Sequence, residues 1–302
     1  MPNIQSQIAY IQSQLASCYS PEEAADLAFW IAEETTGLSR ADISAGKDTQ
    51  NISNIEIILK RLQKKEPIQY IFGHTLWFGL DLLVNSATLI PRPETAELVQ
   101  LLLDSHPADE PFSVLDIGTG SGCIAIALKK RRPNWQIYGL DVSAEALQVA
   151  AQNAIRNNVE VHWLHADIFD PNLQSKIYNR PLAVQSPISN LQSPIYNLQS
   201  KFYNLKCIIS NPPYVLDSEK KTMDLNVLDY EPHTALFVPD NDPLRYYKRI
   251  VELGLSKYLY FEVNEKFASQ VAQLLRENKY ENIEIKRDIY EKERMVCGRI
   301  KE

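Results

Sequence analysis

The chain has 302 residues, of which 45% are hydrophobic and 23% charged, which is typical of a globular protein large enough for two domains. Its 31 basic and 38 acidic residues give a net charge of -7. That balance argues against a protein that coats nucleic acid through a general basic surface, so no direct nucleic-acid binding is expected. No apolar run approaches the roughly 18 residues that span a bilayer, so no membrane association is expected.

The N-terminus and the cysteines indicate the cellular compartment. The first ten residues, MPNIQSQIAY, contain neither a basic leader nor an apolar segment, so no signal peptide is expected. The four cysteines lie far apart and show no C-x-x-C or Cys/His ligand spacing. We therefore expect reduced cysteines, no metal site and a cytoplasmic location.

Residues 1–73 are expected to form a helical domain. In "SPEEAADLAFWIAEETTG", Ser20 and Pro21 are typical of a helix start, and Gly37 is typical of a helix end. The segment 51–67 repeats the amphipathic pattern and ends at Pro67. Residues 74–90 follow as a β-hairpin linker around Gly79.

Residues 91–302 begin with an amphipathic helix and continue with alternating strands and helices. Pro93 and Glu94 open the helix. Strands are predicted at 112–118, 136–142, 161–169, 206–210 and 258–263, and helices over 121–131 and 143–157. This alternation favours an α/β fold with a parallel, doubly wound, Rossmann-like sheet. The last two strands, 282–289 and 294–300, are separated by a few residues and should form an antiparallel hairpin.

Residues 172–204 interrupt this alternation with a low-complexity heptad repeat. The repeat reads LQSKIYN, VQSPISN, LQSPIYN and LQSKFYN. A period of seven is typical of coiled coils, but Pro187 and Pro194 would break a helix. We interpret the segment as a duplicated surface insertion without a chemical role.

The segment "VLDIGTGSG" predicts a ligand-binding turn between a strand and a helix. Gly118, Thr119, Gly120, Ser121 and Gly122 form the turn, whose glycines let the backbone approach a ligand closely. Such turns also occur simply to pack a helix onto a strand. Cys123 stands where the dinucleotide fingerprint needs a small residue, so NAD is not the favoured ligand.

Two carboxylates at the ends of the next two strands strengthen the prediction of a nucleoside site. Asp141 lies 21 residues after Gly120, where a carboxylate can accept hydrogen bonds from ribose hydroxyls. Its alternative role as a helix cap is already filled by Ser143. Asp167 ends the third strand next to apolar Ile168, a combination suited to an adenine ring.

The fourth strand ends at "NPPY", residues 211–214, which combines two hydrogen-bond acceptors with an aromatic ring. The side-chain carbonyl of Asn211 and the main-chain carbonyl of Pro212 can together hold both hydrogens of a planar NH2 group, while Tyr214 stacks beside it. An amide or aromatic amine is a poor nucleophile because its lone pair is delocalised. Catalysis therefore requires its alignment with a reactive methyl sulfonium.

These strand ends together resemble the class I S-adenosylmethionine-dependent methyltransferases. More narrowly, the chain resembles the release factor glutamine N5-methyltransferases of the PrmC/HemK family. The resemblance rests on the following segments: "PIQYIFG", "LIPRPET", "DIGTGSG", "SNPPYV", "YEPHTAL" and "RDIYEKERMV". It implies a seven-stranded sheet with an antiparallel last strand, an N-terminal helical domain for substrate recognition, and S-adenosyl-L-methionine as cofactor.

The resemblance also assigns roles to residues of this sequence. The methionine part of the cofactor would lie against residues 118–122 with Asp116 below, the ribose on Asp141 and the adenine near Asp167 and Ile168. The substrate glutamine, on an exposed loop of a peptide chain release factor, would lie on Asn211, Pro212, Pro213 and Tyr214. Its pocket would be bordered by Arg92, Pro93 and Glu94.

Three residues depart from the family pattern. Ala96 stands where a glutamate usually follows "PRPET", and Glu97 comes one place later. Asn264 and Glu291 each replace a common glycine. The heptad insertion has no counterpart in the family.

Two other functions fit parts of the sequence. An adenine N6-methyltransferase acting on DNA or RNA would bind its planar NH2 group through the same N-P-P-Y residues. The acidic charge balance and the need to flip out a base argue against this function. A catalytically inactive binding protein could keep the fold, but it would need neither Asn211 nor the glycine turn.

Overall fold

The computed structural model describes residues 3–47, 52–173 and 205–301. Nearly all of the predicted heptad insertion therefore lies outside the described residues. The chain divides into two compact units, of which the first comprises Met1–Gly73 and Asp224–Tyr230 and the second comprises His74–Met223 and Glu231–Glu302. None of the described helices is both long and apolar enough to cross a membrane.

The first unit is built from six helices within the described residues. They are α1 (Ile4–Leu15), α2 (Pro21–Thr36), α3 (Arg40–Ser44), α4 (Ile55–Gln63), α5 (Ile68–Phe72) and α10 (Leu225–Tyr230). Ser20 caps α2 by accepting a hydrogen bond from the Glu23 amide, and Gly37 ends it with a φ of 70°. The segment predicted from residue 51 becomes helical at Ile55, and Ile52 is buried before it.

Helix α10 comes from the part of the sequence assigned above to residues 91–302. In the structure the hydroxyl of Tyr230 donates to the carbonyl oxygen of Lys64, at 2.9 Å. A short segment after the N-P-P-Y tetrapeptide is thus grouped with the N-terminal helices. Its apolar pattern over six residues is too short to indicate this partner.

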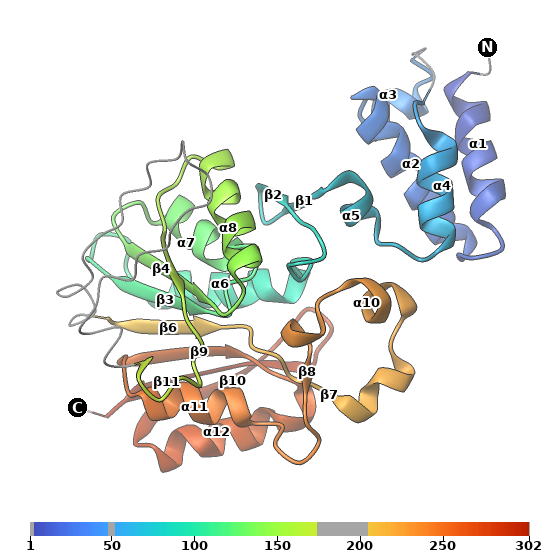
Figure 1. The fold of residues 1–302 in the computed structure, drawn as a ribbon. Coiled ribbons are helices and arrows are strands. Elements are labelled where there is room, and N and C mark those ends of the chain that lie inside the picture. The colour runs from blue at the N-terminus through green and yellow to red at the C-terminus, as the bar shows by residue number, and fades with distance from the viewer. Residues whose placement is uncertain (1–2, 48–51, 174–204, 302) are drawn as a thin grey trace. The chain divides into compact units, whose positions relative to one another are not determined.

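The second unit contains a seven-stranded sheet with the order β10-β11-β9-β6-β3-β4-β5 (Figure 1). The strands are β3 (Ser113–Ile117), β4 (Gln136–Asp141), β5 (His162–His165), β6 (Cys207–Ser210), β9 (Tyr258–Glu262), β10 (Tyr280–Arg287) and β11 (Glu293–Ile300). Neighbouring strands from β5 to β9 are parallel, and β11 is antiparallel to both β9 and β10. The predicted parallel sheet with an antiparallel last strand is confirmed.

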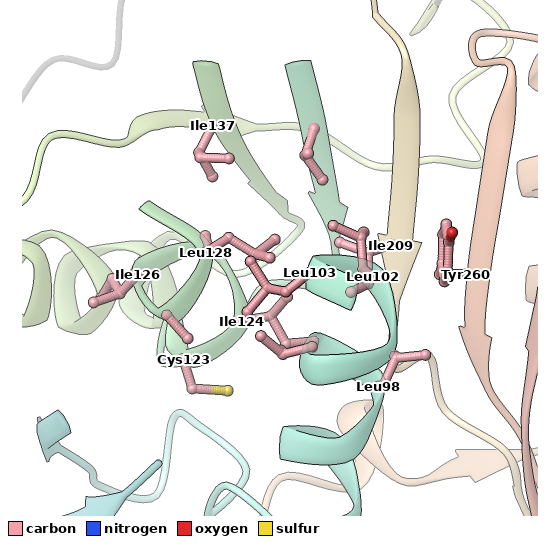
Figure 2. Close-up of a cluster of buried hydrophobic side chains, with 14 of the residues drawn as sticks. Leu98, Leu102, Leu103, Cys123, Ile124, Ile126, Leu128, Ile137, Ile209 and Tyr260 are labelled. Atoms are coloured by element: carbon pink, nitrogen blue, oxygen red, sulfur yellow. The ribbon is translucent and has the colours of Figure 1, made fainter. Parts of the chain in front are cut away.

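Helices cover both faces of this sheet because its strands alternate between two apolar clusters. Val114, Ile137 and Ile209 point into one cluster with α6 (Pro93–Ser105), α7 (Cys123–Arg131) and the end of α8 (Ala144–Arg156). Figure 2 shows side chains of α6 and α7 in this cluster beside Ile209 and Tyr260. The other cluster joins the opposite strand face to α11 (Arg245–Leu253) and α12 (Ala268–Glu277).

A β-hairpin opens the second unit, formed by β1 (His74–Trp77) and β2 (Leu80–Leu83). Its two-residue turn has positive φ at both positions, 49° at Phe78 and 74° at Gly79, as the twist of a tight hairpin requires. The Asn153 side chain of α8 exchanges two hydrogen bonds with the Leu83 backbone, at 2.6 and 2.9 Å. These bonds attach the hairpin to the second unit.

Short elements within residues 215–222, 233–238 and 265–267 complete the second unit. β7 (Val215–Leu216) and β8 (Phe237–Val238) pair in parallel. The 3-10 helices are η3 (Asp217–Thr222), η4 (His233–Ala235) and η5 (Glu265–Phe267).

Candidate active site

Most of the predicted site residues lie at, or just after, the carboxyl ends of four parallel strands, and residues 92–94 lie at the start of α6. The chain runs from β3 outward to β4 and β5, whereas β6 and β9 lie on the other side of β3. The order of strands therefore reverses between β3 and β6, the position at which doubly wound sheets bind ligands. The glycine turn follows β3 and Asn211 follows β6, so the two segments lie on either side of this reversal.

The glycine turn is held by hydrogen bonds to the end of β4. The amides of Gly118 and Thr119 both donate to the carbonyl oxygen of Leu140, at 2.8 and 3.0 Å. Gly118 has a φ of 73°, and an added methyl group would meet no atom within 4 Å. Gly122 has a φ of 79°, and its added methyl group would meet Trp163 at 2.9 Å. One side of the turn is thus open at Gly118, and the other is tightly packed at Gly122.

Asp116 lies buried beneath the turn. Its Oδ2 accepts a hydrogen bond from the Thr119 hydroxyl at 2.5 Å. The backbone amide of Ala125 also acts on this carboxyl, and the buried Ser121 hydroxyl acts on the thiol of Cys123. Burial raises the pKa of Asp116 to about 7, and the hydrogen bonds from Thr119 and Ala125 oppose that effect.

Asp141, at the end of β4, is anchored through both carboxylate oxygens. Oδ2 accepts from the Gly120 amide at 2.8 Å and Oδ1 from the Ser143 amide at 2.9 Å. Burial raises its pKa, and these backbone donors oppose that effect. Each oxygen has a second lone pair, so the carboxylate can still accept from a ligand hydroxyl. The predicted cap at Ser143 is present, since its hydroxyl accepts from the Ala146 amide.

Asp167 and Ile168 follow β5 next to Asp141. The Asp141 carbonyl oxygen accepts from the Ala166 amide at 3.0 Å. The Asp167 side chain is exposed and accepts from the Phe169 amide at 2.8 Å, whereas Ile168 is buried. A carboxylate and an apolar side chain therefore lie beside each other at this strand end.

A hydrogen-bond chain with a buried centre joins both ends of the N-P-P-Y tetrapeptide to two residues that sequence reasoning missed. Asn211 Nδ2 donates to Thr95 Oγ1 at 3.0 Å, and Thr95 Oγ1 donates to Glu262 Oε2 at 2.6 Å. The Tyr214 hydroxyl donates to the other oxygen, Glu262 Oε1, at 2.9 Å. Thr95 belongs to the quoted "LIPRPET" and Glu262 ends the strand "YLYFE", but neither pattern indicates that they meet.

Several groups act on the Glu262 carboxyl besides Thr95. Burial has the largest effect and raises the pKa of Glu262, whereas the hydrogen bonds from Thr95 and Tyr214 lower it. Arg294 also lowers the pKa, and Glu94 raises it. The pKa of Tyr214 is raised well above its usual value, chiefly by burial. The Arg294 guanidinium lies 5.8 Å from the centre of the Tyr214 ring.

The predicted pocket residues 92–94 lie at the start of α6. Arg92 forms an ion pair with Glu231 at 2.5 Å, and the buried Glu231 carboxylate also accepts from the Ile90 amide at 3.1 Å. The motifs "LIPRPET" and "YEPHTAL" therefore meet through this pair. Pro93 is exposed and Glu94 is half-buried in the first helical turn. Pro212 is buried and Pro213 half-buried between Asn211 and Tyr214.

The three departures from the family pattern have different surroundings. Ala96 packs against the apolar cluster of α6, while the neighbouring Glu97 accepts from the Ile289 amide at 3.2 Å. Asn264 has a φ of -66°, which any residue adopts, and donates to the Tyr214 carbonyl oxygen at 3.3 Å. Glu291 has a φ of 61°, the left-handed conformation that favours glycine. Only Glu291 therefore occupies a position where the backbone itself favours glycine.

Two family models match the chain in separate regions. The family described as PrmC N-terminal domain matches residues 7–73, and the methyltransferase small domain matches residues 97–187. Among the described residues, no group of three or more His, Cys, Asp or Glu side chains is placed to hold a metal ion.

Known relatives match over most of the chain. A release factor glutamine methyltransferase of Bacteroides thetaiotaomicron is 38% identical over 300 residues, which cover 96% of this chain and 98% of that protein. One of Flavobacterium psychrophilum is 37% identical over 295 residues and covers 93% and 94% of the two chains. Among solved structures, the hMettl16 catalytic domain in complex with an RNA hairpin has a TM-score of 0.52 at 14% identity, covering 85% of this chain and 86% of that one. That likeness shows the fold alone.

Proposed function

The chain belongs to the release factor glutamine methyltransferase family, and on this premise we propose that it methylates the side-chain amide nitrogen of a glutamine in a peptide chain release factor. S-adenosylmethionine would be the methyl donor. The observation that carries the proposal is the position of Asn211 and Pro212, which offer two amide acceptors at the end of β6, beside the glycine turn of β3.

The residues around the glycine turn fit S-adenosylmethionine. The open space at Gly118 admits a ligand close to the backbone, where a methyl group would meet no atom within 4 Å. Residues 118–122 would hold the methionine part, with Asp116 below, while Asp141 would accept from the ribose hydroxyls. Asp167 and Ile168 would border the adenine. When bound, this cofactor supplies a methyl group on a positively charged sulfur.

The chain's own residues would hold and polarise the substrate nitrogen. Asn211 Oδ1 and the Pro212 carbonyl oxygen would each accept one hydrogen of the glutamine NH2 group, which fixes the direction of its remaining lone pair. As the nitrogen accepts the methyl group it would gain positive charge, and both acceptors would then bind its hydrogens more strongly. One of these two hydrogens would then leave as a proton to solvent, which gives the neutral N-methyl amide. Tyr214 would lie beside the amide plane, with Pro213 and residues 92–94 at the border of the pocket.

The first unit would bind the release factor away from the glutamine. A glutamine on an exposed loop offers little surface, so recognition of a whole protein needs a second contact area. We expect amide hydrogen exchange in the full chain to slow within residues 3–73 when an unmethylated release factor binds. Protection confined to the second unit would contradict this role.

Methyl transfer from labelled S-adenosylmethionine tests the proposal. The purified chain should label a wild-type release factor and leave unlabelled the same factor with its loop glutamine replaced by alanine. Equal labelling of both factors would show that the loop glutamine is not the residue that receives the methyl group. Label on DNA or RNA with none on either factor would indicate an adenine methyltransferase instead.

A further inference from the structure

We propose that Thr95 and Glu262 are positioning residues that fix which end of the Asn211 amide faces the substrate. The inference rests on the proposed function, because it assigns a direction to the acceptor used there. The two residues come from α6 and β9, and Asn211 follows β6. Thr95 and Glu262 are buried, with exposed fractions of 2% and 1%.

The direction of the chain starts at Glu262. In both of its contacts with hydroxyl groups Glu262 is the acceptor. In its ionised form the carboxylate has no hydrogen to donate, so each hydroxyl bonded to it must donate its own. The Tyr214 hydroxyl donates its hydrogen to Oε1 at 2.9 Å, and the Thr95 hydroxyl donates its hydrogen to Oε2 at 2.6 Å. Both hydroxyl hydrogens are thereby committed to one carboxylate.

The committed hydrogen of Thr95 then decides the orientation of Asn211. A threonine hydroxyl carries a single hydrogen, so its oxygen can only accept from the asparagine. The amide NH2 must face Thr95, as the 3.0 Å contact of Nδ2 shows, and Oδ1 must face the opposite way. Among the described residues, no hydrogen bond takes up Oδ1, which leaves it available to a ligand.

This orientation matters because the two ends of an amide have nearly the same shape and opposite hydrogen-bonding character. A reversed Asn211 would direct its own NH2 hydrogens at the NH2 group of the substrate. Burial of Thr95 and Glu262 keeps out water, which could otherwise stabilise either orientation. Thr95 and Glu262 thus act through Asn211 and need no contact with the reacting atoms.

Three substitutions in the full chain separate positioning from packing. Thr95→Val keeps the shape and removes the hydroxyl, Thr95→Ser keeps the hydroxyl, and Thr75→Val replaces another buried threonine of the same unit. We expect Thr95→Val to lower kcat by about tenfold to a hundredfold, with KM for S-adenosylmethionine changed less than about twofold. Thr95→Ser and Thr75→Val should each keep kcat within about threefold of wild type.

Glu262→Gln tests the direction of the chain. In the variant, Thr95 either accepts from the new NH2 group, which frees its hydrogen for a reversed Asn211, or donates to a neutral amide oxygen, which holds that hydrogen less firmly than a carboxylate does. In both cases kcat should fall, and unchanged kcat would overturn the inference. The double variant with Thr95→Val should lose much less than the product of the two single losses.

Each outcome has one meaning. Thr95→Val with wild-type kcat, or losses that Thr95→Ser does not rescue, would overturn the inference. Multiplying losses in the double variant would also overturn it. Wild-type protein that labels no release factor would instead reject the proposed function, whatever the variants do.

Discussion

Two glycines of the same turn have nearly the same backbone and opposite surroundings, so replacing each with alanine separates ligand binding from folding. Gly118 and Gly122 have φ values of 73° and 79°. A methyl group at Gly118 would meet no atom within 4 Å. At Gly122 it would meet Trp163 at 2.9 Å, Ala150 at 3.0 Å and Ile126 at 3.1 Å.

The structure sets different stability costs for the two substitutions. An alanine in the left-handed region costs about 1 kcal/mol at either position. Overpacking adds about 1–3 kcal/mol at Gly122, where three neighbours would have to move. In a unit of this size, 1 kcal/mol corresponds to about 2–4 °C in Tm. Gly118→Ala should therefore lower Tm by about 2–4 °C, and Gly122→Ala by at least about twice as much.

Thermal unfolding and calorimetric titration with S-adenosylmethionine measure both effects. Gly118→Ala should stay folded and lose affinity by about tenfold or more, because its methyl group would fill space needed by the cofactor. Gly254→Ala is the matched control, with a φ of 56°, no atom within 4 Å and a position after α11. Equal affinities of the Gly118 and Gly254 variants would refute the cofactor site. A Gly122 variant as stable as the Gly118 variant would refute the packing argument.

Three further predictions concern ionisable residues. Burial raises the pKa of Asp116 to about 7, so the folded state holds its proton more tightly and stability falls as pH rises toward that value. Asp116→Asn should remove this fall in the free energy of unfolding, which amounts to at most about 4 kcal/mol between about pH 4 and pH 8. Denaturant titrations across this pH range measure it, and the same dependence of unfolding free energy on pH in wild type and variant would contradict the prediction. Glu291→Gly should raise Tm by relieving a φ of 61°, whereas Glu284→Gly in β10 should lower it; the opposite order would reject the strain. The orientation of Asn211 requires an ionised Glu262, so kcat should fall as the pH drops through the raised pKa of Glu262. In Thr95→Val, which lacks the connecting hydroxyl, kcat should depend less on pH in this acidic range. The same acidic fall in kcat in wild type and variant would show that Glu262 does not act on Asn211 through Thr95.

The sequence predicted those parts of the fold that depend on local patterns. Pro93 opens α6, Ser143 caps α8, and Asn211 follows a fully buried strand, as expected from residue types and spacing. The antiparallel hairpin of β10 and β11 followed from the short segment between two strand-like runs. Such features depend on neighbours within a few residues, which the sequence displays directly.

The parts that depend on distant contacts could not be predicted. Thr95 and Glu262 are 167 residues apart, and only the folded sheet brings them together. Helix α10 joins the N-terminal helices through surfaces that a six-residue pattern does not reveal. The positive φ of Glu291 also arises from the geometry of the β10–β11 connection, and the residue type gives no sign of it.

Locating the transferred methyl group tests the central claim most directly. A release factor incubated with the full chain and S-adenosylmethionine would be digested and its peptides sequenced by tandem mass spectrometry. The account predicts a single added methyl group on the side-chain nitrogen of the loop glutamine, absent when Asn211 is replaced by alanine. A methyl group on another residue, or full glutamine methylation by the Asn211→Ala variant, would contradict it.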